Sequence, residues 1–108
     1  MILTDKQRLA AIHDMPCACC ELEHRTQPNK TTAHHIVDNG YRELSGGHQS
    51  TLPLCEWHHL GYRLPTHDFV DMEAKWGPSL ARTKKKWIAR YGGERPLLKI
   101  VNEKLEAA

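Results

Sequence analysis

The chain has 108 residues, a net charge of +2 with neutral histidines and a pI of about 8.4. This length favours a single domain over residues 1–108, and the mild positive charge permits nucleic-acid binding without requiring it. The chain turns polar soon after its start and has no apolar run near the roughly 20 residues of a membrane span. We therefore expect no signal peptide, no membrane contact and a cytoplasmic location. Aromatic residues are few, whereas four cysteines and eight histidines are many for this length.

Capping residues, β-branched runs, glycines and prolines predict the order of the elements. In chain order we expect a helix over 4–13, a cysteine-bearing turn over 16–24, a strand over 31–37, a glycine-bearing loop over 38–50, a strand over 51–55, and helices over 56–63, 68–76, 79–91 and from 96 onward. Two strands among several helices predict an α+β fold.

Two short motifs can supply the ligands of one tetrahedral zinc ion. Two residues separate Cys17 from Cys20, and two residues also separate Cys55 from His58. This gap lets both side chains of a turn reach the same ion, and two such pairs provide four ligands. In the cytosol, cysteines bind metal more often than they form disulfides. The sequence therefore predicts a structural Zn²⁺ at these four residues.

Other interpretations of the cysteines are free buried thiols or a disulfide in an oxidising compartment. Cys19 is left over, either as a small residue of the turn or as a ligand in place of Cys17 or Cys20. A two-Cys, two-His zinc finger is excluded because no closing histidine pair has the required spacing. A zinc deaminase is excluded because no His-x-Glu motif precedes the first cysteine pair.

A second set of histidines lies outside the predicted zinc site. His34 and His35 are adjacent on the first strand, so their side chains point to opposite faces, one toward a metal and the other toward a substrate. His59 follows a zinc ligand on a helix, and the next helical residue points about 100° away. The zinc ion would thus hold the histidine pair beside His59. Surface histidines and extra zinc ligands are the alternative interpretations.

These features resemble the HNH, or ββα-metal (His-Me finger), endonucleases. The segment "AHHI", a glycine-bearing loop, "LPLCEWHH" and the later His67 occur in the order typical of that family. The likeness is greatest to the phage-type, Ref-type RecA-dependent recombination nucleases. It implies a small zinc-stabilised ββα-metal core over about 16–77, with additional flanking helices over 78–108.

The resemblance also implies roles for individual histidines. His34 would bind the catalytic metal, and His35 would be the general base. His59 and His67 would be further ligands of a catalytic Mg²⁺ or Mn²⁺, with Zn²⁺ and Ni²⁺ as other candidates. The middle Asn of the HNH pattern is absent, and Ser50 lies at that point of the chain.

The chemistry of these residues suits the same function. Phosphodiester hydrolysis needs an activated water and a group that stabilises developing negative charge, and a neutral imidazole is a good base near pH 7. We therefore predict a metal-dependent DNA endonuclease with a one-metal mechanism. The resemblance implies 5′-phosphate and 3′-hydroxyl ends, a phage or mobile element acting in a bacterial host cell, and recombination or phage proteins as partners.

Two alternatives come from other functional classes. The first is a non-catalytic zinc-stabilised DNA-binding module, which would not need His35. The second is a zinc-stabilised protein that binds a protein partner through its C-terminal helices. The second set of histidines favours the nuclease.

Basic residues on the predicted helix 79–91 are candidates for phosphate contacts. Arg82, Lys85 and Lys86 lie on the face opposite the apolar residues of that helix. Such runs are usually solvated helix faces, but a nuclease site nearby would favour binding to the DNA backbone. Arg63, one helical turn after His59, is a candidate for contact with the scissile phosphate.

Overall fold

The computed structural model describes residues 3–38 and 40–107. Its elements are α1 (Asp5–Asp14), α2 (Ala18–Leu22), β1 (Thr31–His35), the 3-10 helix η1 (Gly47–Gln49), β2 (Thr51–Cys55), α3 (Glu56–Leu60), α4 (Phe69–Trp76), α5 (Lys84–Tyr91) and α6 (Glu94–Ala107). The predicted α+β class is confirmed, and the chain runs from β1 through β2 into α3. Within the described ranges, no helix has both the length and the apolar character needed to span a membrane.

Several predicted elements differ from the structure. The strand predicted over 31–37 ends at His35, and the helix predicted over 56–63 ends at Leu60, so Arg63 lies outside α3. The cysteine-bearing segment, predicted as a turn, contains the short helix α2. The helix predicted over 79–91 begins only at Lys84, because residues 80–82 form a turn in which the Thr83 N–H donates to the Ser79 carbonyl. Helix α6 begins at Glu94, before the predicted start at Pro96. Proline is tolerated there because the first N–H groups of a helix have no intrahelical partner.

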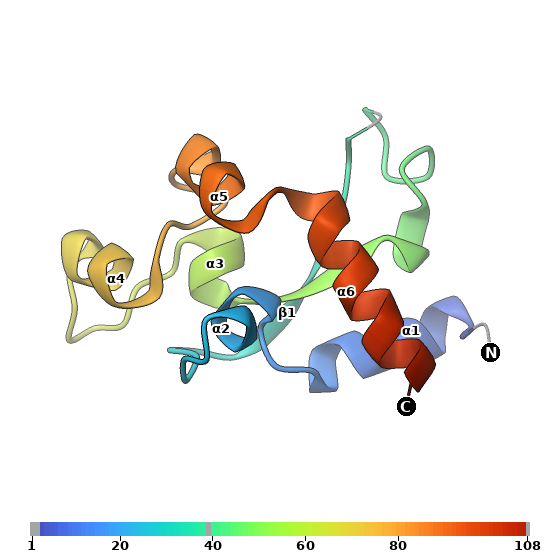
Figure 1. The fold of residues 1–108 in the computed structure, drawn as a ribbon, viewed down its shortest axis with the longest axis horizontal. Helices are drawn as coiled ribbons and strands as arrows, with labels where there is room; N and C mark the ends of the chain where they lie inside the picture. The colour runs from blue at the N-terminus through green and yellow to red at the C-terminus, as the bar shows by residue number, and fades with distance from the viewer. Residues whose placement is uncertain (1–2, 39, 108) are drawn as a thin grey trace.

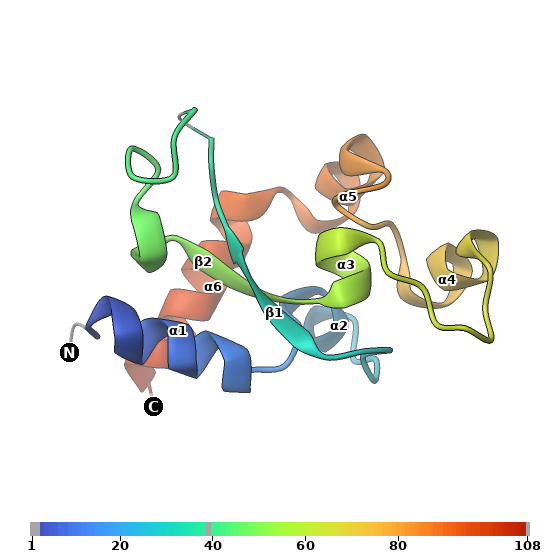
Figure 2. The ribbon, with the colours of Figure 1, turned by 180° about the vertical axis from the view of Figure 1, so that it is seen from behind.

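The two strands form an antiparallel hairpin that places the histidine pair at one end. His34 pairs with Leu52, and His35 pairs with Thr51. β2 is buried along its whole length, whereas β1 is partly exposed. Figure 1 shows α6 lying over β2, and Figure 2 shows the hairpin in front of α6 from the opposite side. At the other end of β2, Cys55 leads directly into α3.

A buried arginine holds the histidine end of the hairpin against two helices. Arg8 of α1 donates from Nε to Thr51 Oγ1 at 3.0 Å and from Nη2 to the Thr51 carbonyl at 2.9 Å. Its Nη1 donates to Asn102 Oδ1 of α6 at 2.8 Å. The surrounding core contains the large side chains Ile12, Ile36, Leu52, Leu54, Trp57, Met72, Trp87, Leu97 and Val101. The strand residue opposite His35 is therefore fixed by α1 and α6.

Helix α3 is short and is held at both ends. At its start, Cys55 Sγ accepts a hydrogen bond from the His58 N–H at 3.5 Å. At its end, Gly61 adopts a left-handed conformation with φ of 75°, and a Cβ there would lie 2.6 Å from Arg82 Cγ. Glycine is needed at this position for both reasons. His58 and His59 are thus carried on a helix whose position is closely defined.

Candidate active site

Cys17, Cys20, Cys55 and His58 form one buried cluster, as the spacing predicted. Their ligand atoms all lie within 4.8 Å of one another. Nδ1 of His58 is 3.4 Å, 3.5 Å and 3.3 Å from the sulfur atoms of Cys17, Cys20 and Cys55. Three sulfurs and one imidazole nitrogen are a typical donor set for tetrahedral zinc. The cluster is consistent with a structural zinc site.

The second ring nitrogen of His58 supports this assignment. Nε2 lies 2.7 Å from the carbonyl oxygen of Trp76, at the end of α4. Because a carbonyl can only accept, Nε2 carries the hydrogen and the neutral ring keeps its lone pair on Nδ1, the atom that faces the three sulfurs. The Trp76 carbonyl therefore selects the ring form that binds metal.

The leftover cysteine is excluded from the ligand group. Cys19 is fully buried, yet the cluster consists of Cys17, Cys20, Cys55 and His58. Hydrogen bonds from the side chains of Cys19, Cys20 and Cys55 lower the pKa of Cys17, whereas burial raises the pKa of Cys19. The pKa values of Cys20 and Cys55 are raised as well, so it is the position of Cys19, and not its pKa, that separates it from the ligands.

The histidine pair lies at a separate pocket of about 470 Å³ at the end of β1. The pocket is lined by His34, His35, Val37, Asp38, Leu80, Lys84 and Glu94. The ring of His59 on α3 meets the ring of His34 edge to face, with centroids 4.8 Å apart. The structure therefore brings His34, His35 and His59 to one region, outside the zinc cluster.

Hydrogen bonds define which nitrogen of His59 is available. Its Nδ1 lies 2.7 Å from the hydroxyl of Thr32, and that hydroxyl donates to the Leu54 carbonyl at 2.8 Å. A hydroxyl has one proton, so His59 must donate from Nδ1 and keeps its lone pair on Nε2. Burial, together with His34 and His35, lowers the pKa of His59 to about 4. The ring is neutral at pH 7, as a metal ligand must be.

His35 contacts a residue of the loop between the strands. Its Nε2 lies 2.8 Å from Nδ1 of His48. Burial, together with the charges of Arg42, His48 and His34, lowers the pKa of His35. A neutral His35 is available to accept a proton near pH 7.

Two charged residues of the C-terminal helices also reach this pocket. Glu94 Oε2 lies 2.6 Å from His34 Nε2, and Lys84 lines the same pocket. Sequence reasoning missed both, because their place depends on how α5 and α6 pack against the hairpin. The one local signal for Glu94 is an acidic residue in the first turn of a helix, and such residues are common without any functional role.

The family model described as "Recombination enhancement, RecA-dependent nuclease" matches residues 3–106. The chain belongs to this nuclease family. The match extends through α5 and α6, so the helices that supply Lys84 and Glu94 are part of the family's own domain. No solved structure matches the chain.

The structure places His67 of this RecA-dependent nuclease away from the other histidines. Its Nε2 lies 3.0 Å from Nζ of Lys75, and its ring packs against Trp76 with centroids 5.5 Å apart. Among residues 3–38 and 40–107, the zinc cluster is the one group of three or more His, Cys, Asp or Glu side chains close enough to share an ion. His67 is therefore not assembled with His34 and His59, and its role as a ligand stays a prediction.

The predicted DNA-contact residues of the nuclease fall into two groups. Arg63 and Arg82 both lie over the ring of Phe69, at 5.8 Å and 3.5 Å from its centroid. Lys86 forms an ion pair with Glu73 of α4 at 3.5 Å, and Lys85 is exposed on α5. None of Arg63, Arg82, Lys85 and Lys86 is among the residues that line the histidine pocket, whereas Lys84 is.

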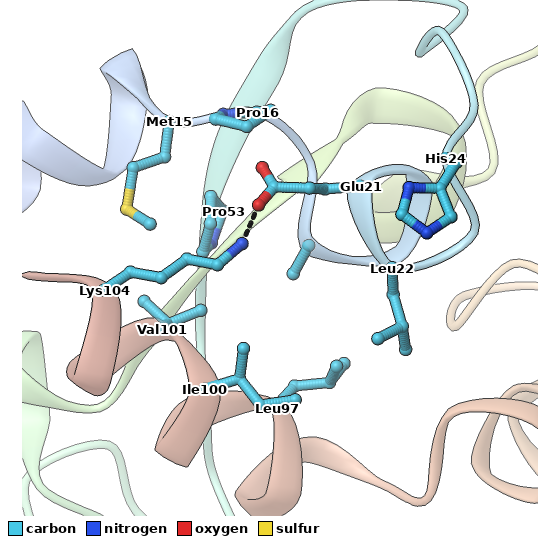
Figure 3. Close-up of a pocket in the computed structure, with 11 residues that line it drawn as sticks. Met15, Pro16, Glu21, Leu22, His24, Pro53, Leu97, Ile100, Val101 and Lys104 are labelled. Carbon is cyan, nitrogen blue, oxygen red and sulfur yellow. Dashed lines mark ion pairs between the residues drawn. The ribbon is translucent and has the colours of Figure 1, made fainter.

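A second hollow of the nuclease, about 490 Å³ in volume, lies between α2 and α6 (Figure 3). Its walls are mainly apolar, with Leu22 and Ile100 facing it, and an ion pair joins Lys104 to Glu21 across one side. A hydrolytic site needs a base and charged groups at one place. The hollow is also lined by His24, but its carboxylate and its lysine pair with each other, whereas the histidine pocket brings two histidines together with Glu94 and Lys84. The histidine pocket is therefore the candidate active site.

Proposed function

We propose that this nuclease is an HNH-type, metal-dependent DNA endonuclease in which His35 is the general base and His34 and His59 are ligands of one divalent ion. The observation that carries the proposal is the meeting of His34, on β1, with His59, on α3, beside His35. The order of two strands and a helix is that of the ββα-metal core. The donors fit an ion because each ligand ring has one nitrogen bonded to a neighbour and one free.

Each side chain has a defined task in this proposal. His35 takes a proton from the attacking water, as a neutral imidazole can. His34 and His59 hold the ion, which when bound supplies stabilisation of negative charge on the phosphate. Lys84 offers a positive charge to the DNA backbone at the same pocket. His67 would have to leave Lys75 and Trp76 to join this set, so two imidazoles are the protein ligands here.

The direct test is cleavage of supercoiled plasmid and of single-stranded DNA by the zinc-loaded chain. We expect nicking or linearisation with added Mg²⁺ or Mn²⁺ and none after a chelator has removed the added ion while zinc is retained. The products should carry 5′-phosphates. Binding of DNA without cleavage under any of these ions would contradict the proposal and favour the zinc-stabilised DNA-binding module.

A pair of adjacent lysines tests which face of α5 approaches DNA. Lys84→Ala is expected to weaken DNA binding and to reduce the salt dependence of log K by about 1, the effect of one lost phosphate contact. Lys85→Ala, at the next position of the same helix, is the matched control and should change both quantities less. Affinities measured by fluorescence anisotropy at several salt concentrations give the comparison. An equal effect of both substitutions would place the DNA path elsewhere on α5.

A further inference from the structure

The first turn of α6 supplies a carboxylate to the candidate metal site from a distant part of the sequence. Glu94 Oε2 and His34 Nε2 are 2.6 Å apart although the two residues lie 60 positions apart in the chain. Both side chains are largely shielded from water, with 19 % and 15 % of their surface exposed. A glutamate carboxyl is ordinarily ionised at neutral pH, and the His34 ring is placed to donate a hydrogen bond to it.

The direction of this hydrogen bond determines the form of the imidazole. An ionised carboxylate can only accept, so His34 donates from Nε2. In the neutral ring the lone pair then lies on Nδ1. Metal-binding histidines commonly donate their second N–H to a carboxylate or carbonyl, which fixes the ring and makes it a better ligand. In the same way, His59 donates from Nδ1 to the Thr32 hydroxyl, and His58 donates from Nε2 to the Trp76 carbonyl.

We infer that Glu94 is a positioning residue for His34, whose carboxylate holds the Nε2–H so that Nδ1 binds the divalent ion. This inference rests on the proposed function, because it concerns the same ion. It assigns to the C-terminal helix, which lies outside the ββα core, a direct effect on metal affinity.

Two other roles for Glu94 can be separated from this one. If Glu94 were itself a ligand together with both histidines, the three ligand atoms would lie close together, and within the described part of the chain they do not form such a group. If Glu94 served only to attach α6 to the rest of the fold, then removing its neighbour Arg95, which also attaches α6, would have the same effect on the metal site. Arg95 pairs with Asp38 at 2.6 Å and 2.7 Å and donates to the Ser45 carbonyl at 2.9 Å. Arg95 is therefore the matched control.

The experiment compares Glu94→Ala, Glu94→Gln and Arg95→Ala in the full, zinc-loaded chain. Mn²⁺ affinity is measured by electron paramagnetic resonance, and the protonated nitrogen of His34 is identified by long-range proton–nitrogen NMR without added Mn²⁺. Glu94→Ala should weaken Mn²⁺ binding about 10- to 100-fold and leave His34 in a mixture of ring forms. Glu94→Gln keeps an oxygen that accepts the hydrogen bond, so it should keep the Nε2–H form and lose less affinity. Arg95→Ala should lower thermal stability and leave both readouts unchanged.

Three results would overturn the inference. Unchanged affinity and an unchanged ring form in Glu94→Ala would show that the carboxylate does not position His34. A loss in Glu94→Gln as large as in Glu94→Ala, with the ring form retained, would make Glu94 a ligand itself. An equal loss in Arg95→Ala would make the contact a helix attachment.

The proposed function fails on a different result. The ion site is absent if the unmodified chain binds no Mn²⁺, or if His59→Ala binds Mn²⁺ as tightly as the unmodified chain does. The NMR measurement needs no added ion, so it still reports whether Glu94 holds His34. The two failures are therefore distinguishable.

Discussion

Replacing Cys20 with serine is expected to remove the bound zinc and unfold the chain, whereas replacing Cys19 with serine should do neither. The two residues are adjacent and both are buried, but only Cys20 belongs to the ligand cluster. A structural zinc site contributes an apparent 10–16 kcal/mol, about as much as the whole stability of a typical domain. Cys19→Ser buries a hydroxyl at a cost of about 1–3 kcal/mol, which a zinc-loaded domain can tolerate.

The measurement is the zinc content of each purified variant, together with its far-UV circular dichroism. We expect one zinc per chain in the unmodified protein and in Cys19→Ser, and less than a tenth of that in Cys20→Ser. Stripping zinc from the unmodified chain with a strong chelator should reproduce the spectrum of Cys20→Ser. Loss of zinc in Cys19→Ser with retention in Cys20→Ser would exchange the ligand roles of the two cysteines.

The zinc ligands could be predicted from the sequence because their geometry is local. In each pair the two ligands lie three positions apart, and this spacing alone lets both side chains reach one ion. The same holds for the start of α1, where Thr4 accepts from the Gln7 N–H and the Gln7 side chain accepts from the Thr4 N–H. Each ligand pair and the helix cap are thus local features that a single sequence contains, although the two ligand pairs meet only in the folded chain.

The second site could be predicted only in part because its neighbours come from distant segments. His34, His35 and His59 lie in or next to elements with clear patterns, and the structure brings them together. Glu94 and His48 contact them through the packing of α6 and of the loop between the strands, which leaves no periodic signal in the sequence.

The start of α5 shows how an amphipathic pattern can extend beyond a helix. Leu80 is buried and falls on the same predicted face as Trp87, which suggested one continuous helix. A turn at 80–82 also buries Leu80, and the Leu80 N–H donates to the His58 carbonyl at 2.9 Å. Burial alone therefore did not distinguish the turn from a helix. The difference matters for function, because it makes Lys84 the first residue of α5 and places it at the histidine pocket.

His35→Ala is expected to reduce DNA cleavage about 100- to 10,000-fold, the range typical of a lost general base. The substitution leaves His34, His59 and Lys84 in place, so the affinities for Mn²⁺ and for DNA should change little. The loss should therefore appear in the single-turnover rate at saturating enzyme and metal. Added imidazole should restore part of this rate, because a small base can enter the space that the side chain occupied.

The matched control is His13→Ala, which removes an exposed histidine of α1 and should cleave at the unmodified rate. Both variants must contain one zinc per chain and melt near the unmodified protein, so that a folding defect is not mistaken for a chemical one. Equal cleavage by His35→Ala and the unmodified chain would exclude His35 as the base. A lost rate without rescue, combined with weakened Mn²⁺ binding, would instead make His35 a ligand, and the base would then have to be sought elsewhere at the pocket. Rescue by imidazole with full Mn²⁺ affinity is the result that assigns proton transfer to His35 and ion binding to His34 and His59.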